Sequence, residues 1–103
     1  MSFNRKWNIF EMELWQADYF NMEVQAFIEI DEKAGTGEFQ FGLVSGSIDG
    51  ELAKDKFKFT WDGVDECDEV SGSGWVKLKE PDILEGAFKI HQGDKSKFLA
   101  HKA

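Results

Sequence analysis

Hydrophobic and polar residues alternate strictly in the segment 56–61. The hydrophobic set is Phe57, Phe59 and Trp61, and the polar set is Lys56, Lys58 and Thr60. A period of two places each set on its own face of an extended chain. The segment is therefore predicted to be an antiparallel strand with one buried face and one solvent-exposed face.

Further strands are predicted along the chain, separated by short turn-rich segments. The expected strands are 26–31, 37–48, 56–61, 74–79, 83–90 and 97–102, and turns are expected at 34–37, 49–50, 62–63, 81 and 92–94. Gly42 and Gly46 indicate a bulge or bend within the strand 37–48. Every connection is too short for a crossover helix, which favours antiparallel hairpins. The sequence thus predicts an all-β fold, a small antiparallel up-and-down barrel (lipocalin-like meander) of about six to eight strands, with residues 1–103 as a single domain.

The N-terminal segment 7–15 does not alternate, because it is apolar at both odd and even positions. A strand buried on both faces has this pattern, and so does a helix with Trp7, Phe10 and Leu14 on one side. We expect a strand through about Trp15, followed by an irregular or one-turn helical stretch at 16–23. In the helical alternative the segment would cap one mouth of the barrel.

Composition and charge narrow the range of functions. The chain has 103 residues, of which 42% are hydrophobic and 15% aromatic, enough for one core without metal or disulfide support. A net charge of -8 with Arg5 as the only arginine argues against a nucleic-acid partner. The single Cys67 excludes an intrachain disulfide, and neither a signal peptide nor an apolar run of about 20 residues is visible. A cytoplasmic protein without a membrane partner is the expectation.

An acidic segment follows the alternating strand and is the main candidate for a binding site. Its carboxylates are Asp62, Asp65, Glu66, Asp68 and Glu69. They provide the oxygen ligands that Ca²⁺ requires, but the spacing is not that of a calcium-binding loop. We expect a hairpin loop whose Asp side chains cap its own amides, with metal binding or contact with a basic partner as alternatives. No cofactor is implied.

The sequence supports a catalytic site less well than a binding site. Cys67 lies between two acids, which disfavours the reactive thiolate. His91, Asp94 and Ser96 have the residue types of a hydrolytic triad but are crowded into one turn, so that the three groups are poorly placed to act in sequence. Trp61 and Trp75 flank the acidic segment and are expected to pack in the core, with a pocket at the barrel mouth as the alternative.

Five motifs occur in order along nearly the whole chain. They are W-x-I-x-x-M-x-x-W from Trp7, G-x-F-x-F-G from Gly37, F-x-W-x-G-x-D-E from Phe59, G-x-G-W from Gly72 and H-x-G-D-x-S-x-F-x-A from His91. Together they resemble a family of short, uncharacterised bacterial proteins. The resemblance implies a bacterial cytosolic protein and no named activity.

The sequence supports three hypotheses about function. The first is a non-enzymatic barrel that binds an unknown small ligand or a basic protein, as a monomer or homodimer. The others are an acidic inhibitor or immunity-type protein for a basic partner, and a metal-assisted hydrolase that uses the acidic loop with His91. The candidate ligand- or partner-binding residues are Trp61, Asp62, Asp65, Glu66, Asp68, Trp75, His91 and Asp94.

Overall fold

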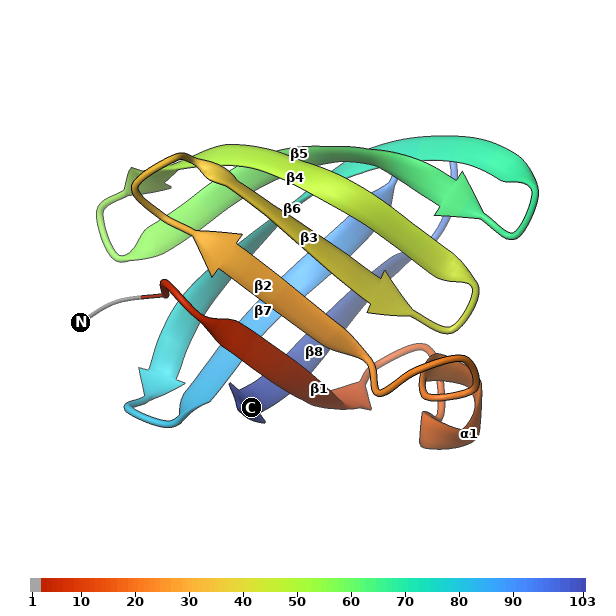
Figure 1. The fold of residues 1–103 in the computed structure, drawn as a ribbon, viewed down its shortest axis with the longest axis horizontal. Helices are drawn as coiled ribbons and strands as arrows, with labels where there is room; N and C mark the ends of the chain where they lie inside the picture. Colours follow the sequence, from red (N-terminus) through yellow and green to blue (C-terminus); the bar gives the residue numbers. More distant parts are fainter. Residues whose placement is uncertain (1–2) are drawn as a thin grey trace.

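Eight antiparallel strands form a closed barrel in the computed structural model, which describes residues 3–103 (Figure 1). The strands are β1 Lys6–Met12, β2 Phe27–Asp31, β3 Thr36–Phe41, β4 Val44–Ala53, β5 Lys56–Asp65, β6 Asp68–Glu80, β7 Ile83–Ile90 and β8 Lys95–Lys102. Each strand pairs with the next in sequence, and β1 pairs with β8 to close the barrel. The expected up-and-down barrel is confirmed. Closure also removes the exposed sheet edges that would otherwise invite aggregation.

The expected single strand 37–48 is wrong, because the chain turns at its centre. β3 ends at Phe41 and β4 begins at Val44. Gly42 adopts a φ of 59°, a conformation that suits glycine because it has no Cβ. The ring of Tyr19 also packs so closely against Gly42 that a Cβ there would collide with it. Gly42 therefore makes a hairpin turn instead of a bulge.

Two of the expected Asp-Gly turns also lie inside strands. Asp49 and Gly50 pair with Thr60 and Phe59 in the middle of the β4–β5 ladder. The dipeptide 62–63 likewise continues β5. Chain reversal occurs instead beyond these pairs, where Lys54 and Glu66 have φ values of 61° and 60°. Strand pairing thus overrides the local turn preference and makes both hairpins longer than the sequence indicates.

The N-terminal segment forms a strand and then one turn of helix, as expected. β1 ends at Met12, and the helix α1 spans Ala17–Phe20. Phe20 is buried, and its carbonyl accepts a hydrogen bond from the amide of Gly42 at 2.8 Å. Figure 1 shows α1 at one end of the barrel, which we call the α1 mouth. No helix in the described part of the chain is both long and apolar enough to cross a membrane.

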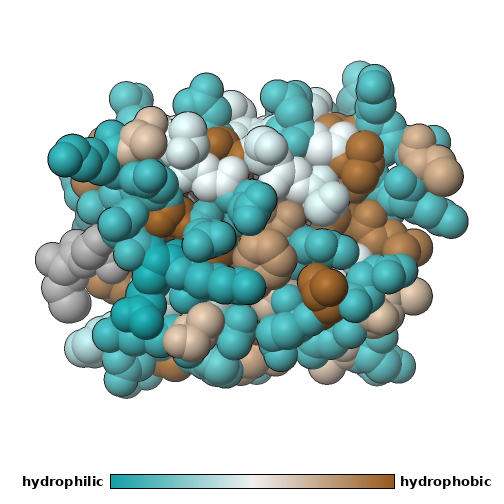
Figure 2. Space-filling model, viewed as in Figure 1, coloured by the Kyte–Doolittle hydropathy of each residue, from teal (hydrophilic) through white to brown (hydrophobic). Residues whose placement is uncertain are grey.

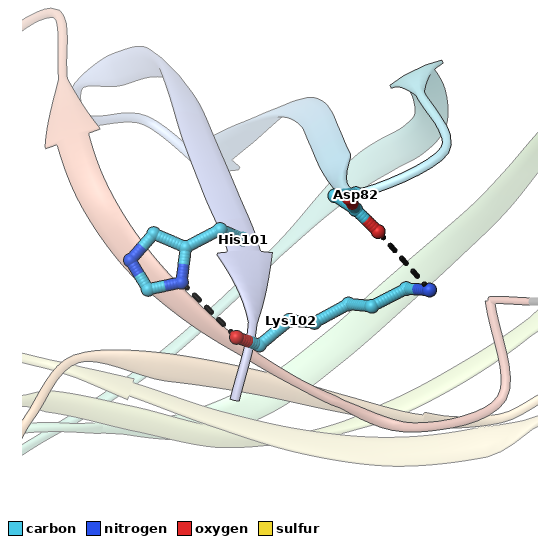
Figure 3. Close-up of polar contacts among 3 residues, drawn as sticks. All are labelled: Asp82, His101 and Lys102. Carbon is cyan, nitrogen blue, oxygen red and sulfur yellow. Dashed lines mark hydrogen bonds and ion pairs between the residues drawn. The ribbon is translucent and has the colours of Figure 1, made fainter.

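Four connections meet at the α1 mouth. They are the β1–β2 connection with α1, the β3–β4 turn, the β5–β6 hairpin and the β7–β8 turn. The opposite mouth holds the remaining turns and the C-terminal end of β8. There the Lys102 ammonium lies 3.2 Å from Asp82 in the β6–β7 turn, and His101 Nδ1 donates to the Lys102 carbonyl at 3.1 Å (Figure 3). The acidic hairpin and the turn of His91 thus share one end of the molecule.

Aromatic side chains fill the interior. The ring centroid of Phe88 on β7 lies 4.6 Å from Phe39 and 5.0 Å from Phe41, both on β3. It also lies 4.7 Å from Phe98 on β8. Strands β3 and β7 are not neighbours in the sheet, so the contacts with Phe39 and Phe41 cross the barrel. The centre is therefore packed with side chains, as in other small barrels.

Glycines that face inward make room for these rings. Four large rings lie directly opposite an inward glycine on a neighbouring strand: Phe39 opposite Gly46, Trp61 opposite Gly72, Phe59 opposite Gly74 and Phe98 opposite Gly86. A Cβ on Gly74 would lie 2.6 Å from Phe59 Cζ and would also collide with the carbonyl oxygen of Ala87. The ring thus occupies the volume that a side chain on the facing strand would need.

The Gly74→Ala substitution is expected to lower the free energy of unfolding by about 1–3 kcal/mol, because the added methyl group overpacks the core against backbone as well as a ring. The measurement is the urea midpoint at unchanged m value. Gly93→Ala is the matched control, since its Cβ would come no closer than 3.2 Å to the Ile90 side chain and 3.7 Å to the Ile90 carbonyl oxygen. The control should change stability by less than about 0.5 kcal/mol. A Gly74→Ala protein as stable as the unmodified one would contradict the packing described here.

Candidate functional site

The acidic segment is a tight hairpin and not the loop that the sequence indicates. β5 continues to Asp65 and β6 begins at Asp68, so only Glu66 and Cys67 lie outside the strands. Asp65 and Asp68 are directly opposite in register. Like charges in directly opposed positions repel, and this repulsion is relieved when a cation approaches. We call the five carboxylates of this hairpin the acidic rim: Asp62, Asp65, Glu66, Asp68 and Glu69.

The expected capping of the acidic hairpin's own amides by its Asp side chains is not seen among residues 3–103, whereas Asp31 Oδ1 accepts from the Ala34 amide at 3.1 Å in the β2–β3 turn. The amide of Glu66 donates instead to the carbonyl of Leu43 at 2.9 Å, which joins the hairpin to the β3–β4 turn. The Asp62 side chain is exposed, as are those of Glu66 and Asp68, whereas Asp65 is half-buried. The rim carboxylates are therefore displayed on the hairpin and are not used to hold it together.

His91 lies beside the rim on the outer surface. Its Nδ1 is 3.3 Å from Ser71 Oγ, and its amide donates to the Ser71 carbonyl at 2.9 Å. A hollow of about 530 Å³ lies here, lined by Asp62, Glu69, Val70, Ser71, His91 and Gln92. The structure thus brings Asp62 and His91 to one surface, two of the residues that the sequence singles out.

Asp94 and Ser96 do not join His91 in a catalytic arrangement. The turn of Asp94 is closed through the backbone, where the Ile90 amide donates to the Asp94 carbonyl at 2.9 Å. Ser96 is fully buried, and its hydroxyl accepts from the Leu14 amide at 3.1 Å and donates to the Lys97 carbonyl at 3.0 Å. Its hydroxyl therefore fastens the β1–α1 connection to β8 and is not available as a nucleophile.

The two tryptophans that flank the acidic segment lie on opposite faces of the sheet. Trp61 is directly opposite Gly72 and points into the barrel, where it is 2% exposed and its indole nitrogen has no hydrogen-bond partner among the described residues. Trp75 is opposite Lys58 on the outer face, and the Lys56 ammonium lies 4.6 Å from its ring centroid. The prediction of packing in the core is confirmed for Trp61 and is wrong for Trp75, which lies on the outer face. A shared pocket between the two rings is excluded, because the sheet separates them.

An acidic outer surface was not identified from the sequence. It consists of the outward carboxylates of β2, β3 and β4: Glu29, Asp31, Glu38, Asp49 and Glu51. We call it the acidic wall. Glu29 and Glu38 are directly opposite each other, beside a hollow of about 510 Å³ that Arg5 also lines. This face of the molecule is largely hydrophilic, with hydrophobic side chains scattered over it (Figure 2). The sequence feature that could have indicated this surface is the set of outward positions on β2, β3 and β4, none of which is a lysine.

Comparisons with known proteins give no relative. No family model matches the chain, and no curated protein or solved structure is similar enough to count as a match. The resemblance to short bacterial proteins therefore stays a prediction, and the surfaces of the barrel are the basis for inferring function.

Divalent metals are expected to leave the melting temperature within about 1 °C of its value without metal, because a ligand stabilises a protein only if it binds the native state. Among residues 3–103, no group of three or more His, Cys, Asp or Glu side chains is arranged to hold a metal ion. Thermal melts with saturating Ca²⁺, Mg²⁺, Mn²⁺ or Zn²⁺ test this. A rise of several degrees with one ion, abolished by Asp62→Asn or His91→Gln, would restore the metal-assisted hydrolase.

Proposed function

We propose that this protein is a non-enzymatic binding module that engages a basic partner through its acidic rim. The observation that carries this proposal is the lack of ion pairing at the rim. Two ion pairs occur among residues 3–103, Lys77 with Glu85 and Lys102 with Asp82, and neither includes a rim carboxylate. The rim thus presents its negative charge to the solvent, where a cationic partner can neutralise it.

The packing of the barrel supports binding at the surface. Rings that meet across the interior leave the centre filled, which argues against a carrier with an internal ligand. Binding and catalytic groups commonly lie on loops held by a rigid scaffold. The β5–β6 hairpin is a rigid support of this kind, because a backbone hydrogen bond joins it to Leu43. Because the backbone of the hairpin is already fixed, only the carboxylate side chains have to be ordered when a partner binds, which favours affinity.

The acidic wall extends the surface that a basic partner would meet. Asp62 lies directly opposite Ser47 on β4, so the rim continues into the outer face of that strand. Negative charge on adjoining surfaces attracts a cationic protein before contact and raises the association rate. An inhibitor or immunity-type protein for a basic enzyme is one form that such a module would take. A cytoplasmic protein of a bacterium, monomeric or homodimeric, is the setting that we propose with it.

Reversing two rim charges, in the double variant Glu66→Lys with Asp68→Lys, is expected to weaken binding of a ten-residue lysine peptide roughly tenfold at low ionic strength. The peptide represents a basic partner, and fluorescence anisotropy measures its affinity. The matched control is Asp55→Lys with Glu80→Lys, which changes the net charge equally at the opposite mouth. The control should weaken binding only about twofold, because its charges are distant from the rim.

The proposal fails if the two double variants lose affinity equally, since total charge and not the rim would then govern binding. It also fails if affinity is the same at about 20 mM and about 300 mM salt, because exposed charges are screened within roughly a Debye length. Folding of each variant is checked by its urea midpoint, so that a loss of affinity is not a loss of structure.

A further inference from the structure

The outer face of β6, β7 and β8 differs in charge from the rest of the barrel. This wall lies behind β1–β4 in the view of Figure 1. Its outward positions form three rows across the strands: Ser73–Lys89–Lys95, Trp75–Ala87–Lys97 and Lys77–Glu85–Leu99. Four of these positions are lysines, and the only acid, Glu85, is paired with Lys77 at 3.4 Å. The wall thus carries excess positive charge around one aromatic ring.

A trough lies on this wall, on the side of Trp75 that faces β7 and β8. Ala87 lies between Trp75 on β6 and Lys97 on β8. Ala87 is only 4% exposed, because its larger neighbours cover it from outside, and Gly86 and Phe98 line the trough instead. The trough has a volume of about 550 Å³, and Trp75, Lys97 and Leu99 are among the residues that line it.

The indole of Trp75 is held in place from the other side. The Lys56 ammonium on β5 lies 4.6 Å from the ring centroid, while the trough adjoins Trp75 on the side of β7 and β8. Lys56 does not line the trough. A ring that is supported in this way loses little freedom when a flat group stacks on it, so the stacking energy is retained as affinity.

The far side of the trough is closed by acids. Glu11 and Glu13 line it near the end of β1, and Glu13 Oε1 accepts from the Lys97 amide at 3.4 Å. These carboxylates limit the positive region to the side of Trp75 and Lys97. Together with the net charge of -8, they disfavour a long polyanion, which would have to cross them.

We propose that the trough binds a small anion that carries a planar ring, in the chemical class of a nucleoside monophosphate. The ring stacks on Trp75 beside Gly86, and the anionic group lies near Lys97 and Lys79, which line the trough. The ring and the charge are both required, because a single exposed lysine contributes little affinity. This site is separate from the acidic rim, so either proposal can hold without the other.

The test is a two-dimensional ¹H–¹⁵N NMR titration of the whole protein with AMP. The indole signal of Trp75 is assigned by its loss in Trp75→Leu. AMP should shift this signal and the Gly86 amide saturably, and it should leave the Trp61 indole unmoved, because Trp61 faces the interior. Adenosine alone and inorganic phosphate alone should each bind at least about fivefold more weakly than AMP, because each lacks one half of the recognised group.

Variants locate the site. Trp75→Leu should weaken AMP at least about fivefold, as expected for loss of one stacked base. Lys97→Gln should weaken it about threefold, while Lys33→Gln, an equal charge change in the β2–β3 turn, should alter affinity less than about 1.5-fold. Both Trp75→Leu and Lys97→Gln change side chains on the outer face, and dispersed NMR spectra confirm that they fold.

Three results would overturn the inference. The first is the absence of saturable shifts at Trp75 and Gly86 with AMP. The second is equal binding of AMP by the Lys97→Gln and Lys33→Gln proteins, or of phosphate and AMP by the unmodified protein. The third is tighter binding of a short oligothymidylate than of AMP, which would make the wall a surface for single-stranded nucleic acid.

Discussion

The barrel depends on the pairing of a large ring with a glycine on the adjacent strand. Four rings lie opposite inward glycines, and a Cβ on Gly72 would lie 2.8 Å from Trp61 Nε1, just as one on Gly86 would lie 2.8 Å from Phe98 Cε1. Small barrels need alternating small and large residues because the interior tapers. Here the small partner has no side chain at all, so each ring packs directly on backbone. The fit also leaves the Trp61 indole nitrogen without a partner among the described residues.

This packing determines where binding can occur. The rings of Phe39, Phe88 and Phe98 are in contact from β3 to β8, so the interior is used for stability. Residues that contact another molecule must then lie at the mouths of the barrel or on its outer walls. At the α1 mouth, Ser96 holds the helix connection and His91 contacts Ser71, which separates the groups that a hydrolase would have to bring together. A rigid barrel with functional groups only outside is suited to recognition.

Two parts of the outer surface carry opposite charge. Carboxylates gather at the rim and on β2–β4, whereas lysines gather with Trp75 on β6–β8. Side chains alternate between the two faces of a strand, so the outward residues of each strand can carry charge without changing the inward residues that form the core. Barrel closure then places outward residues of successive strands in rows. The same molecule can therefore offer a cationic partner and an anionic ligand different surfaces.

Alternation of apolar residues was enough to predict the closed antiparallel barrel, the strand-then-helix order near the N-terminus and the burial of Phe57, Phe59 and Trp61. The face of Trp75 was not predictable, because it depends on the register across the hairpin at Glu66 and Cys67. Hairpins with an odd and an even number of loop residues put Trp75 on opposite faces, because a shift of one position in register moves a side chain to the other face. The acidic wall and the Trp75 trough likewise join residues from different strands. Only strand pairing in three dimensions decides which of these residues become neighbours.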